Sequence, residues 1–200
     1  MTTFISKIAA LVCLVLLSPI LFLFGLLIYF KSPGPLFYSQ KRVGKDGVLF
    51  QLYKLRTMAT NSQEILNEII AADPEMAREW KAYGCFQKDP RIAGHMAKYA
   101  RQFSVDELPQ LVNIVRGDMH FVGPRPLEVE FNEQLNSEDR ALRLSVKPGL
   151  TGLWQVGPRS YSNHRQMMKY DRLYVENQSP KLDFYILLKT IGVIFKRTGF

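Results

Sequence analysis

The chain begins with a long apolar segment, because residues 8–30 contain no charged side chain. As a helix that rises 1.5 Å per residue, about 23 residues extend roughly 34 Å, enough to cross a bilayer core of about 30 Å. A cleaved signal peptide would have a shorter apolar region followed by small residues, whereas this run ends in Tyr29-Phe30-Lys31. The pattern therefore predicts a retained membrane segment, and we assign residues 1–31 to it.

The pair Ser18-Pro19 lies at the middle of this segment. Pro19 has no N–H to donate to the Val15 carbonyl and its ring clashes with the preceding turn, so a kink is expected, and Ser18 can bond a carbonyl left free. Each half has about eleven residues and reaches only about 16 Å. A sharp bend would therefore give a re-entrant helix hairpin that enters and leaves one leaflet. A kinked spanning helix fits the same pattern, because membrane helices tolerate proline.

After the membrane segment, two β-prone runs, residues 36–43 and 48–57, flank Gly44-Lys45-Asp46-Gly47. The Asp-Gly pair is typical of a tight hairpin turn. This pattern predicts a β-hairpin that carries the positive charges of Lys41, Arg42, Lys54 and Arg56, which at a sheet edge are often only solvated.

Helical spacing then predicts a helix over residues 62–72, and Asp73-Pro74 ends it and begins another, with Asp as N-cap and Pro at the first position. Near the C-terminus, the apolar residues that recur at helical spacing are Phe184, Leu187, Leu188, Ile191, Ile194 and Phe195. A core helix is the default interpretation, and an interfacial amphipathic helix on anionic lipid is the alternative. Residues 32–200 are thus predicted to form one helix-rich α+β domain with a small β-hairpin.

Composition restricts the partners. The formal charge of +8 predicts negatively charged partners, such as nucleic acid, anionic membrane lipids or phosphorylated small molecules. The basic residues form no separate stripe with stacking aromatics, which argues against nucleic acid. Two cysteines give no disulfide framework, and three scattered histidines give no zinc or iron site. Of the 26 Lys and Arg residues, only Lys7 precedes the uncharged run of residues 8–30, which favours a cytoplasmic position for the body of the protein.

The densest group of chemically unusual residues lies between Arg101 and Pro126. Asp106 and Glu107 are adjacent carboxylates near the predicted start of a helix that ends at Gly117. A helix start keeps carboxylates ionised and lets backbone N–H groups receive phosphate oxygens. Helix-start electrostatics alone would explain the same residues. Arg125 lies between two prolines that fix its backbone, which suits a guanidinium that binds two phosphate oxygens at once, although a stiff structural turn has the same sequence.

Several motifs occur together along the chain: Ser18-Pro19, KSPGPLFYSQKRVGKDG (31–47), YKLRTM (53–58), KDPRI (88–92), SVDELPQL (104–111), GDMHFVGPRP (117–126) and VKPGLTGLWQV (146–156). In this order they resemble the monotopic phosphoglycosyl transferases, also called bacterial sugar transferases, over nearly the whole chain. The chain looks like the minimal catalytic unit of that family.

The resemblance implies a function. A sugar 1-phosphate would pass from a UDP-sugar to polyprenyl (undecaprenyl) phosphate with release of UMP, at the cytoplasmic face of the bacterial inner membrane. This is the first membrane step of surface glycan assembly, so downstream glycosyltransferases are possible partners.

The resemblance also implies roles for individual residues. Asp106 would be the nucleophile of a covalent intermediate, and Glu107 with Asp106 would hold Mg²⁺. The phosphate- and substrate-binding residues would be Arg101, Arg125, Lys54, Arg56 and Arg159. Ser18 and Pro19 would break the re-entrant helix. The turn Gly157-Pro158-Arg159 departs from the family's usual Asn-Gly-Arg or Ser-Gly-Arg, which changes the backbone setting of Arg159.

Two other classes of protein fit parts of the sequence. A metal-dependent glycosyltransferase would release UDP, but no Asp-x-Asp motif occurs in the chain. A membrane-anchored basic scaffold or lipid-binding protein would explain the charge and the anchor. It gives no reason for the Asp106-Glu107 pair or for the proline-flanked Arg125.

Overall fold

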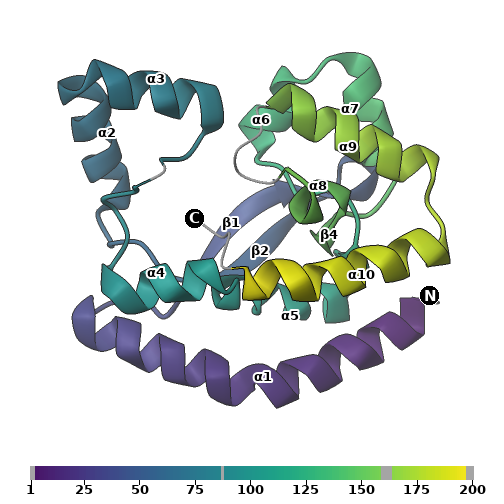
Figure 1. Cartoon of the computed structure of the whole chain (residues 1–200), viewed down its shortest axis with the longest axis horizontal. Helices are drawn as coiled ribbons and strands as arrows, with labels where there is room; N and C mark the ends of the chain where they lie inside the picture. The colour runs from purple at the N-terminus through teal and green to yellow at the C-terminus, as the bar shows by residue number, and fades with distance from the viewer. Residues whose placement is uncertain (1–2, 87, 159–163, 197–200) are drawn as a thin grey trace.

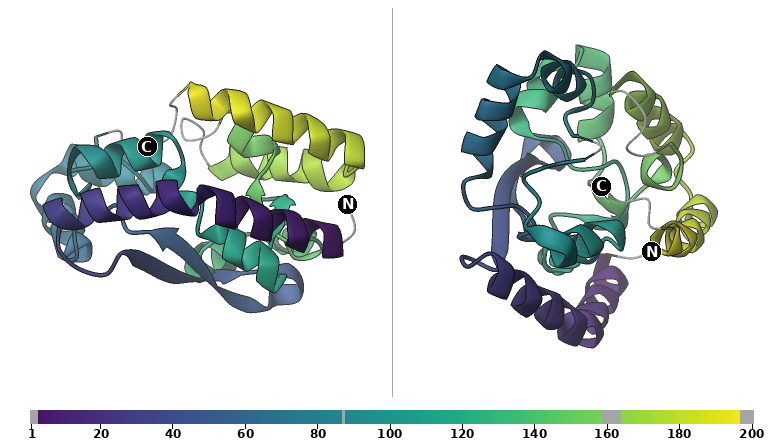
Figure 2. Two further views of the ribbon diagram at one scale, coloured as in Figure 1. Left: turned by 90° about the horizontal axis from the view of Figure 1, so that it is seen from below. Right: turned by 60° about the vertical axis from the view of Figure 1, so that its left-hand side comes forward.

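The apolar segment forms a single helix. The computed structural model describes residues 3–86, 88–158 and 164–196, and helix α1 (Thr3–Lys31) continues through Pro19. The Ser18 hydroxyl donates to the Val15 carbonyl at 2.8 Å, which confirms the bond expected for the oxygen that Pro19 leaves free. The helix bends near its middle and continues, so the sharp turn expected for a helix hairpin is not formed in this segment (Figures 1 and 2).

Helix α1 lies along one side of the body and has two different faces (Figure 1). Its inner face buries Ala10 and Ile28 completely or nearly so. Ala10 belongs to a cluster around α5 (Gln110–Arg116), and Ile28 to one around α4 (Gly94–Gln102). The outer face is exposed and apolar, and α1 is long and apolar enough to cross a membrane by length and composition. Since Ala10 and Ile28 lie in different halves of α1, both halves of the helix pack on the same body.

The predicted β-hairpin is confirmed. Strands β1 (Phe37–Val43) and β2 (Leu49–Leu55) pair antiparallel, with Tyr38 opposite Lys54 and Arg42 opposite Phe50. The 3-10 turn η1 (Lys45–Gly47) connects them, and Asp46 takes a left-handed conformation with φ of 56°. Aspartate tolerates this conformation better than most residues, so the sequence of the turn suits its shape.

The remaining elements are mostly short helices. In chain order they are α2 (Ser62–Ala72), α3 (Pro74–Tyr83), α4, η2 (Val105–Glu107), α5, β3 (His120–Val122), α6 (Val129–Gln134), α7 (Ser137–Leu144), β4 (Gly149–Thr151), α8 (Leu153–Val156), α9 (His164–Glu176) and α10 (Pro180–Phe195). Strands β3 and β4 pair in parallel. The cap predicted at Asp73 is confirmed, since its carboxylate accepts from the N–H groups of Glu75 and Met76. The α+β class is confirmed as well.

Helix α10 is only partly a core helix. Ile186 is buried, and Leu182 and Leu187 pack beside it against Val122 and Tyr174. Most of the apolar positions predicted from its spacing are exposed instead, namely Phe184, Leu188, Ile191 and Phe195. The core interpretation is therefore wrong for this face, which fits the interfacial alternative.

We expect Pro19→Ala to straighten α1. Alanine restores the N–H for the Val15 carbonyl and removes the ring clash, a change of about 3 kcal/mol in a helix interior. Spin labels at Phe4→Cys and Phe30→Cys, two exposed positions, would report the distance between the helix ends. A straight helix places these positions about 39 Å apart, so the variant should show a longer and narrower distance distribution than the bent wild type.

These measurements need a background in which Cys13 and Cys85 are replaced by serine. Leu16→Ala is the matched control, because Leu16 is exposed and lies about one turn from Pro19. Identical distances in the wild type and the Pro19→Ala variant would show that the bend has another cause.

Candidate active site

Asp106 and Glu107 lie in the 3-10 turn η2, one turn before helix α5. The predicted helix start at Asp106 is thus displaced to Gln110. Pro109 has no N–H with which an α-helix could reach the Val105 carbonyl, and that carbonyl accepts from Leu108 instead. Gly117 ends α5 in a left-handed conformation, as predicted. Asp106 is buried, with 7% of its surface exposed.

Two cations meet on Glu107. Its Oε1 lies 3.3 Å from Lys54 Nζ and 3.0 Å from Arg125 Nη2. Lys54 comes from strand β2 and Arg125 from the loop after β3, so one carboxylate joins three segments of the chain. Among the residues that the structure describes, Asp106 makes no ion pair within 4.0 Å. The cations are held by Glu107, and the carboxylate beside it is left unpaired.

Burial and charge act in opposite directions on Asp106. Burial raises the pKa of this carboxyl, Lys54 lowers it, Glu107 raises it, and Arg101 and Arg125 lower it. Burial also lowers the pKa of Lys54, while Glu107 raises it. The site therefore contains two carboxylates and three cations, an excess of positive charge suited to an anionic ligand.

The loop that carries Arg125 is fixed by a very close backbone contact. Gly123 N–H donates to the Thr151 carbonyl, and Gly149 N–H donates to the Pro124 carbonyl, both at 2.9 Å. A Cβ atom at Gly149 would lie 2.1 Å from the Gly123 nitrogen, and one at Gly152 would lie 2.2 Å from the Gly123 oxygen. Glycine is therefore required at positions 149 and 152, because a side chain at either position would collide with the backbone of Gly123.

A buried arginine holds the same loop from the other side. Arg143 of α7 donates to the carbonyl of Arg125 and forms an ion pair with Asp171 of α9. Both Arg143 and Asp171 are buried. The sequence analysis missed this pair, because its members lie far from Arg125 in the chain and on helices with no other unusual residue.

Asn113 aligns β2 with helix α5, which follows the turn of Asp106 and Glu107. It is fully buried, accepts from the Tyr53 N–H at 3.2 Å and donates to the Gln51 carbonyl at 2.6 Å. This fixes the part of β2 that presents Lys54. Sequence reasoning also missed Asn113, although an amide inside the apolar run LVNIV was a signal for a buried polar contact.

Comparisons with known proteins identify the family. The family model described as "Bacterial sugar transferase" matches residues 1–197. The chain belongs to the bacterial sugar transferase family.

Three curated relatives of this sugar transferase show the range of lengths in the family. The exopolysaccharide production protein ExoY of Rhizobium meliloti is 39% identical over 191 residues, covering 96% of this chain and 84% of the relative. The undecaprenyl-phosphate galactose phosphotransferase of Salmonella typhimurium is 41% identical over 169 residues, covering 84% of this chain but only 35% of the relative. The UDP-glucose:undecaprenyl-phosphate glucose-1-phosphate transferase of Caulobacter vibrioides is 34% identical, with 94% and 67% covered.

The other predicted site residues of the sugar transferase are placed differently. Arg101 donates to the Thr57 hydroxyl at 3.4 Å and lies close enough to influence Asp106. Arg56 is not brought to this site, because its guanidinium donates to the carbonyls of Ser32, Pro35 and Met58 and to the Ser32 hydroxyl. It clamps the turn after α1 to the hairpin. Arg159 lies outside the described residues.

We expect Gly149→Ala to destabilise the sugar transferase and reduce its activity. A methyl group at this position meets backbone atoms that cannot move aside, and overpacking of this kind typically costs about 1–3 kcal/mol. For a domain of this size, the melting temperature in detergent should fall by roughly 2–10 °C.

Gly192→Ala is the control for this substitution. Gly192 lies in α10 with no atom near its Cβ direction, so alanine should raise stability by about 0.5–1 kcal/mol. A Gly149→Ala protein as stable as the wild type would mean that the two backbone segments do not approach as described.

Proposed function

We propose that this protein transfers a sugar 1-phosphate from a UDP-sugar to undecaprenyl phosphate, or a similar polyprenyl phosphate, and releases UMP. The observation that carries the proposal is the buried, unpaired Asp106 beside the cluster of Glu107, Lys54 and Arg125. Relatives named as UDP-sugar or undecaprenyl-phosphate sugar phosphotransferases support the same reaction.

The proposed reaction has two steps. A carboxylate oxygen of Asp106 attacks the β-phosphorus of the UDP-sugar, the bond from that phosphorus to the bridging oxygen breaks, and UMP leaves with the electron pair. The polyprenyl phosphate oxygen then attacks the same phosphorus and releases the Asp106 carboxylate. A phosphate monoester has a second pKa of about 6 and is already anionic near pH 7, so the second step needs little deprotonation.

The cations of the site suit a diphosphate. Lys54 and Arg125 share one Glu107 oxygen in the structure, and Arg125 has about a third of its side chain (35%) exposed. Phosphate oxygens entering from the open side can accept from the exposed guanidinium in a bidentate arrangement. Arg101 adds a third positive charge near Asp106. Together these residues offset the charge that would otherwise repel an attacking carboxylate.

Magnesium fits this donor set. Mg²⁺ is commonly held by one or two carboxylates together with substrate phosphates, and Asp106 and Glu107 offer two adjacent carboxylates. In the described part of the chain, no group of three or more histidine, cysteine or carboxylate side chains forms a protein-only cage. We propose that these two residues would hold Mg²⁺ together with the diphosphate, whose charge the ion would offset.

The packing of α1 supports a re-entrant placement in the membrane. A spanning helix would carry one end to the far side of the bilayer, away from the body, whereas both halves of α1 contact the body. With the apolar outer face of α1 in lipid and the exposed face of α10 at the interface, the domain would lie on one side of the membrane. The charge distribution favours the cytoplasmic face of the bacterial inner membrane, where surface glycan assembly would begin.

The covalent step predicts a distinct stoichiometry. With a UDP-sugar and Mg²⁺ but no polyprenyl phosphate, the protein should release at most about one UMP per active site. The peptide that contains Asp106 should gain the mass of a phospho-sugar. Asp106→Asn should abolish both signals without lowering the melting temperature, since an amide keeps the shape and removes a buried charge. UMP release that strictly requires polyprenyl phosphate, with no labelled peptide, would rule out the covalent intermediate.

Arg125→Lys should reduce turnover about 10- to 100-fold, since a point charge cannot replace the planar fork and each hydrogen bond to a charged group contributes about 1.5–3 kcal/mol. Arg78→Lys on the exposed surface of α3 is the matched control and should retain full activity. Steady-state UMP release with saturating polyprenyl phosphate measures both variants. Equal activity in the two would exclude phosphate recognition by Arg125.

A further inference from the structure

Buried polar atoms without partners are concentrated in two residues. In the described part of the chain, the buried side-chain nitrogens and oxygens that make no hydrogen bond are Arg42 Nε, Gln155 Nε2 and Gln155 Oε1. Folded proteins leave few such atoms, because a buried polar group without a partner has lost its hydrogen bonds to water. The two residues are distant in the sequence, and both lie next to the loop that carries Arg125.

Arg42 lies against the far end of the Arg125 loop. Its Nη2 pairs with Glu128 Oε1 at 2.9 Å and with Gln40 Oε1 at 2.7 Å, while Val43 N–H donates to the Leu127 carbonyl. Burial lowers the pKa of Arg42, Glu128 raises it, and the charge of Arg125 lowers it. Arg42 and Val43 are thus joined to Glu128 and Leu127, which follow Arg125 by three and two residues, and the Glu128 side chain is half exposed.

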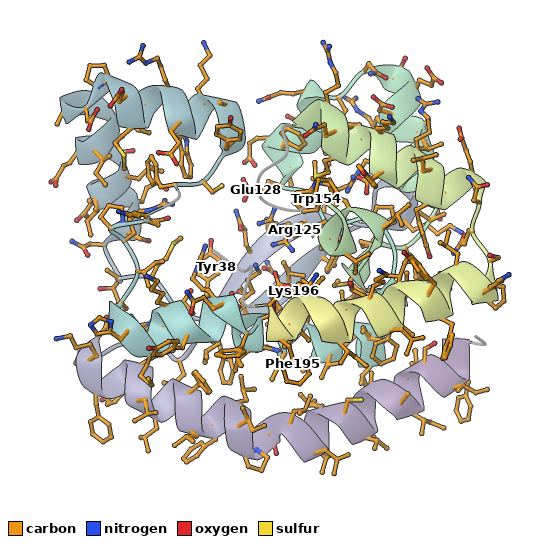
Figure 3. All side chains as sticks on the ribbon, viewed as in Figure 1. Tyr38, Arg125, Glu128, Trp154, Phe195 and Lys196 are labelled. Atoms are coloured by element: carbon orange, nitrogen blue, oxygen red, sulfur yellow. The ribbon has the colours of Figure 1, made fainter. Side chains whose placement is uncertain are left out.

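Gln155 lies against the near end of the same loop. Only 8% of its surface is exposed, and a Cβ at Gly152 would touch both its Oε1, at 2.7 Å, and the carbonyl oxygen of Gly123, at 2.2 Å. The neighbouring Trp154 packs against the cluster of Leu127. Figure 3 shows Trp154 and Glu128 on the same side of Arg125. The two residues with unpartnered atoms therefore flank the loop that presents Arg125.

We propose that Arg42 and Gln155 bind the sugar of the nucleotide-sugar donor and help to select it. This inference rests on the proposed function. The sugar is joined through one oxygen to the phosphorus that Asp106 attacks, so a sugar must lie beside the phosphate that Arg125 binds. Arg42 contacts Glu128, which follows Arg125 in the loop, and Gln155 lies by Gly123, which precedes Arg125.

The chemistry of the two side chains matches hydroxyl groups better than phosphate. A phosphate oxygen only accepts hydrogen bonds, whereas a sugar hydroxyl both donates and accepts. The Gln155 amide offers two donors and one acceptor, and the pair of Arg42 with Glu128 also offers both kinds of group. A site built to bond a hydroxyl discriminates strongly against a sugar that lacks it or presents it differently, because its own buried groups are then left unpaired.

The test compares binding of UDP-galactose, UDP-glucose and UDP-N-acetylgalactosamine with binding of UDP, which has no sugar. Gln155→Met keeps the length of the side chain and removes the amide. It should weaken the best-bound UDP-sugar about 5- to 150-fold, the equivalent of 1–3 kcal/mol, and leave UDP binding unchanged. Arg42→Lys keeps the charge without Nε, and should likewise weaken the UDP-sugar and spare UDP.

The melting temperature separates binding from structure. If the amide only packs, Gln155→Met removes unpartnered polar atoms, so stability stays equal or rises and UDP-sugar binding stays unchanged, which would overturn the proposal. An equal loss for UDP and the UDP-sugars would also overturn it, because the contact would then be to the nucleotide or its phosphates. Gln178→Met, an exposed position whose amide donates to Tyr174 at the end of α9, is the control and should change neither ligand.

The proposed function can fail separately from this inference. In that case the wild-type protein itself would neither bind the UDP-sugars nor release UMP from them. A wild type that releases UMP, together with a Gln155→Met variant and an Arg42→Lys variant that bind every UDP-sugar as it does, would refute only the sugar subsite.

Discussion

The ion pairs of Glu107 with Lys54 and Arg125 join the three chain segments that form the candidate site. Two adjacent carboxylates that lie largely out of water repel each other and lose hydration, and such a pair persists only where cations come close. Lys54 and Arg125 both approach the same Glu107 oxygen. The strand β2, the turn η2 and the loop after β3 must therefore meet at one point, and errors in any of them would leave a buried charge without compensation.

Other contacts of the core can be understood as supports for that meeting point. Asn113 fixes β2 to α5 through backbone bonds on both sides of Leu52. Arg143 and the close approach of Gly123 to Gly149 hold the Arg125 loop from opposite sides. Backbone hydrogen bonds and buried ion pairs have little freedom to adjust, so the position of Arg125 is set before any ligand arrives, which lowers the ordering cost of binding.

The local pattern of the sequence predicted the hairpin, the helix of residues 62–72, the cap at Asp73 and the bond from Ser18 to Val15, because each depends on neighbours within a few positions. The resemblance in motifs also predicted a common site for Asp106, Glu107, Lys54, Arg101 and Arg125. The sequence did not predict which residues distant in the chain contact one another. Nothing local distinguishes Arg56, which clamps backbone carbonyls, from Arg125, or reveals that Arg143 binds a loop 18 residues away.

The same limit explains α10, where helical spacing predicted an apolar face but could not say what that face meets. Helix periodicity reports which residues lie together. Whether they are buried depends on other elements, and here Ile186 turns inward while Phe184 and Leu188 turn outward. In a protein that binds a membrane, an apolar helix face says even less about burial, because such a face can contact either lipid or the protein core.

The turn that carries Asp106 and Glu107 is anchored on helix α1. Val105 and Leu108, which lie on either side of the two carboxylates, pack with Leu21 and Ile28 of α1 in one apolar cluster. If the outer face of α1 lies in lipid, Asp106 is held one helix diameter, about 10 Å, from the acyl chains. A polyprenyl phosphate keeps its tail in the bilayer and its phosphate at the surface, so it could meet Asp106 without leaving the membrane. With α1 in that position, packing of η2 on α1 would set the depth of Asp106 relative to the bilayer as well as the stability of the turn.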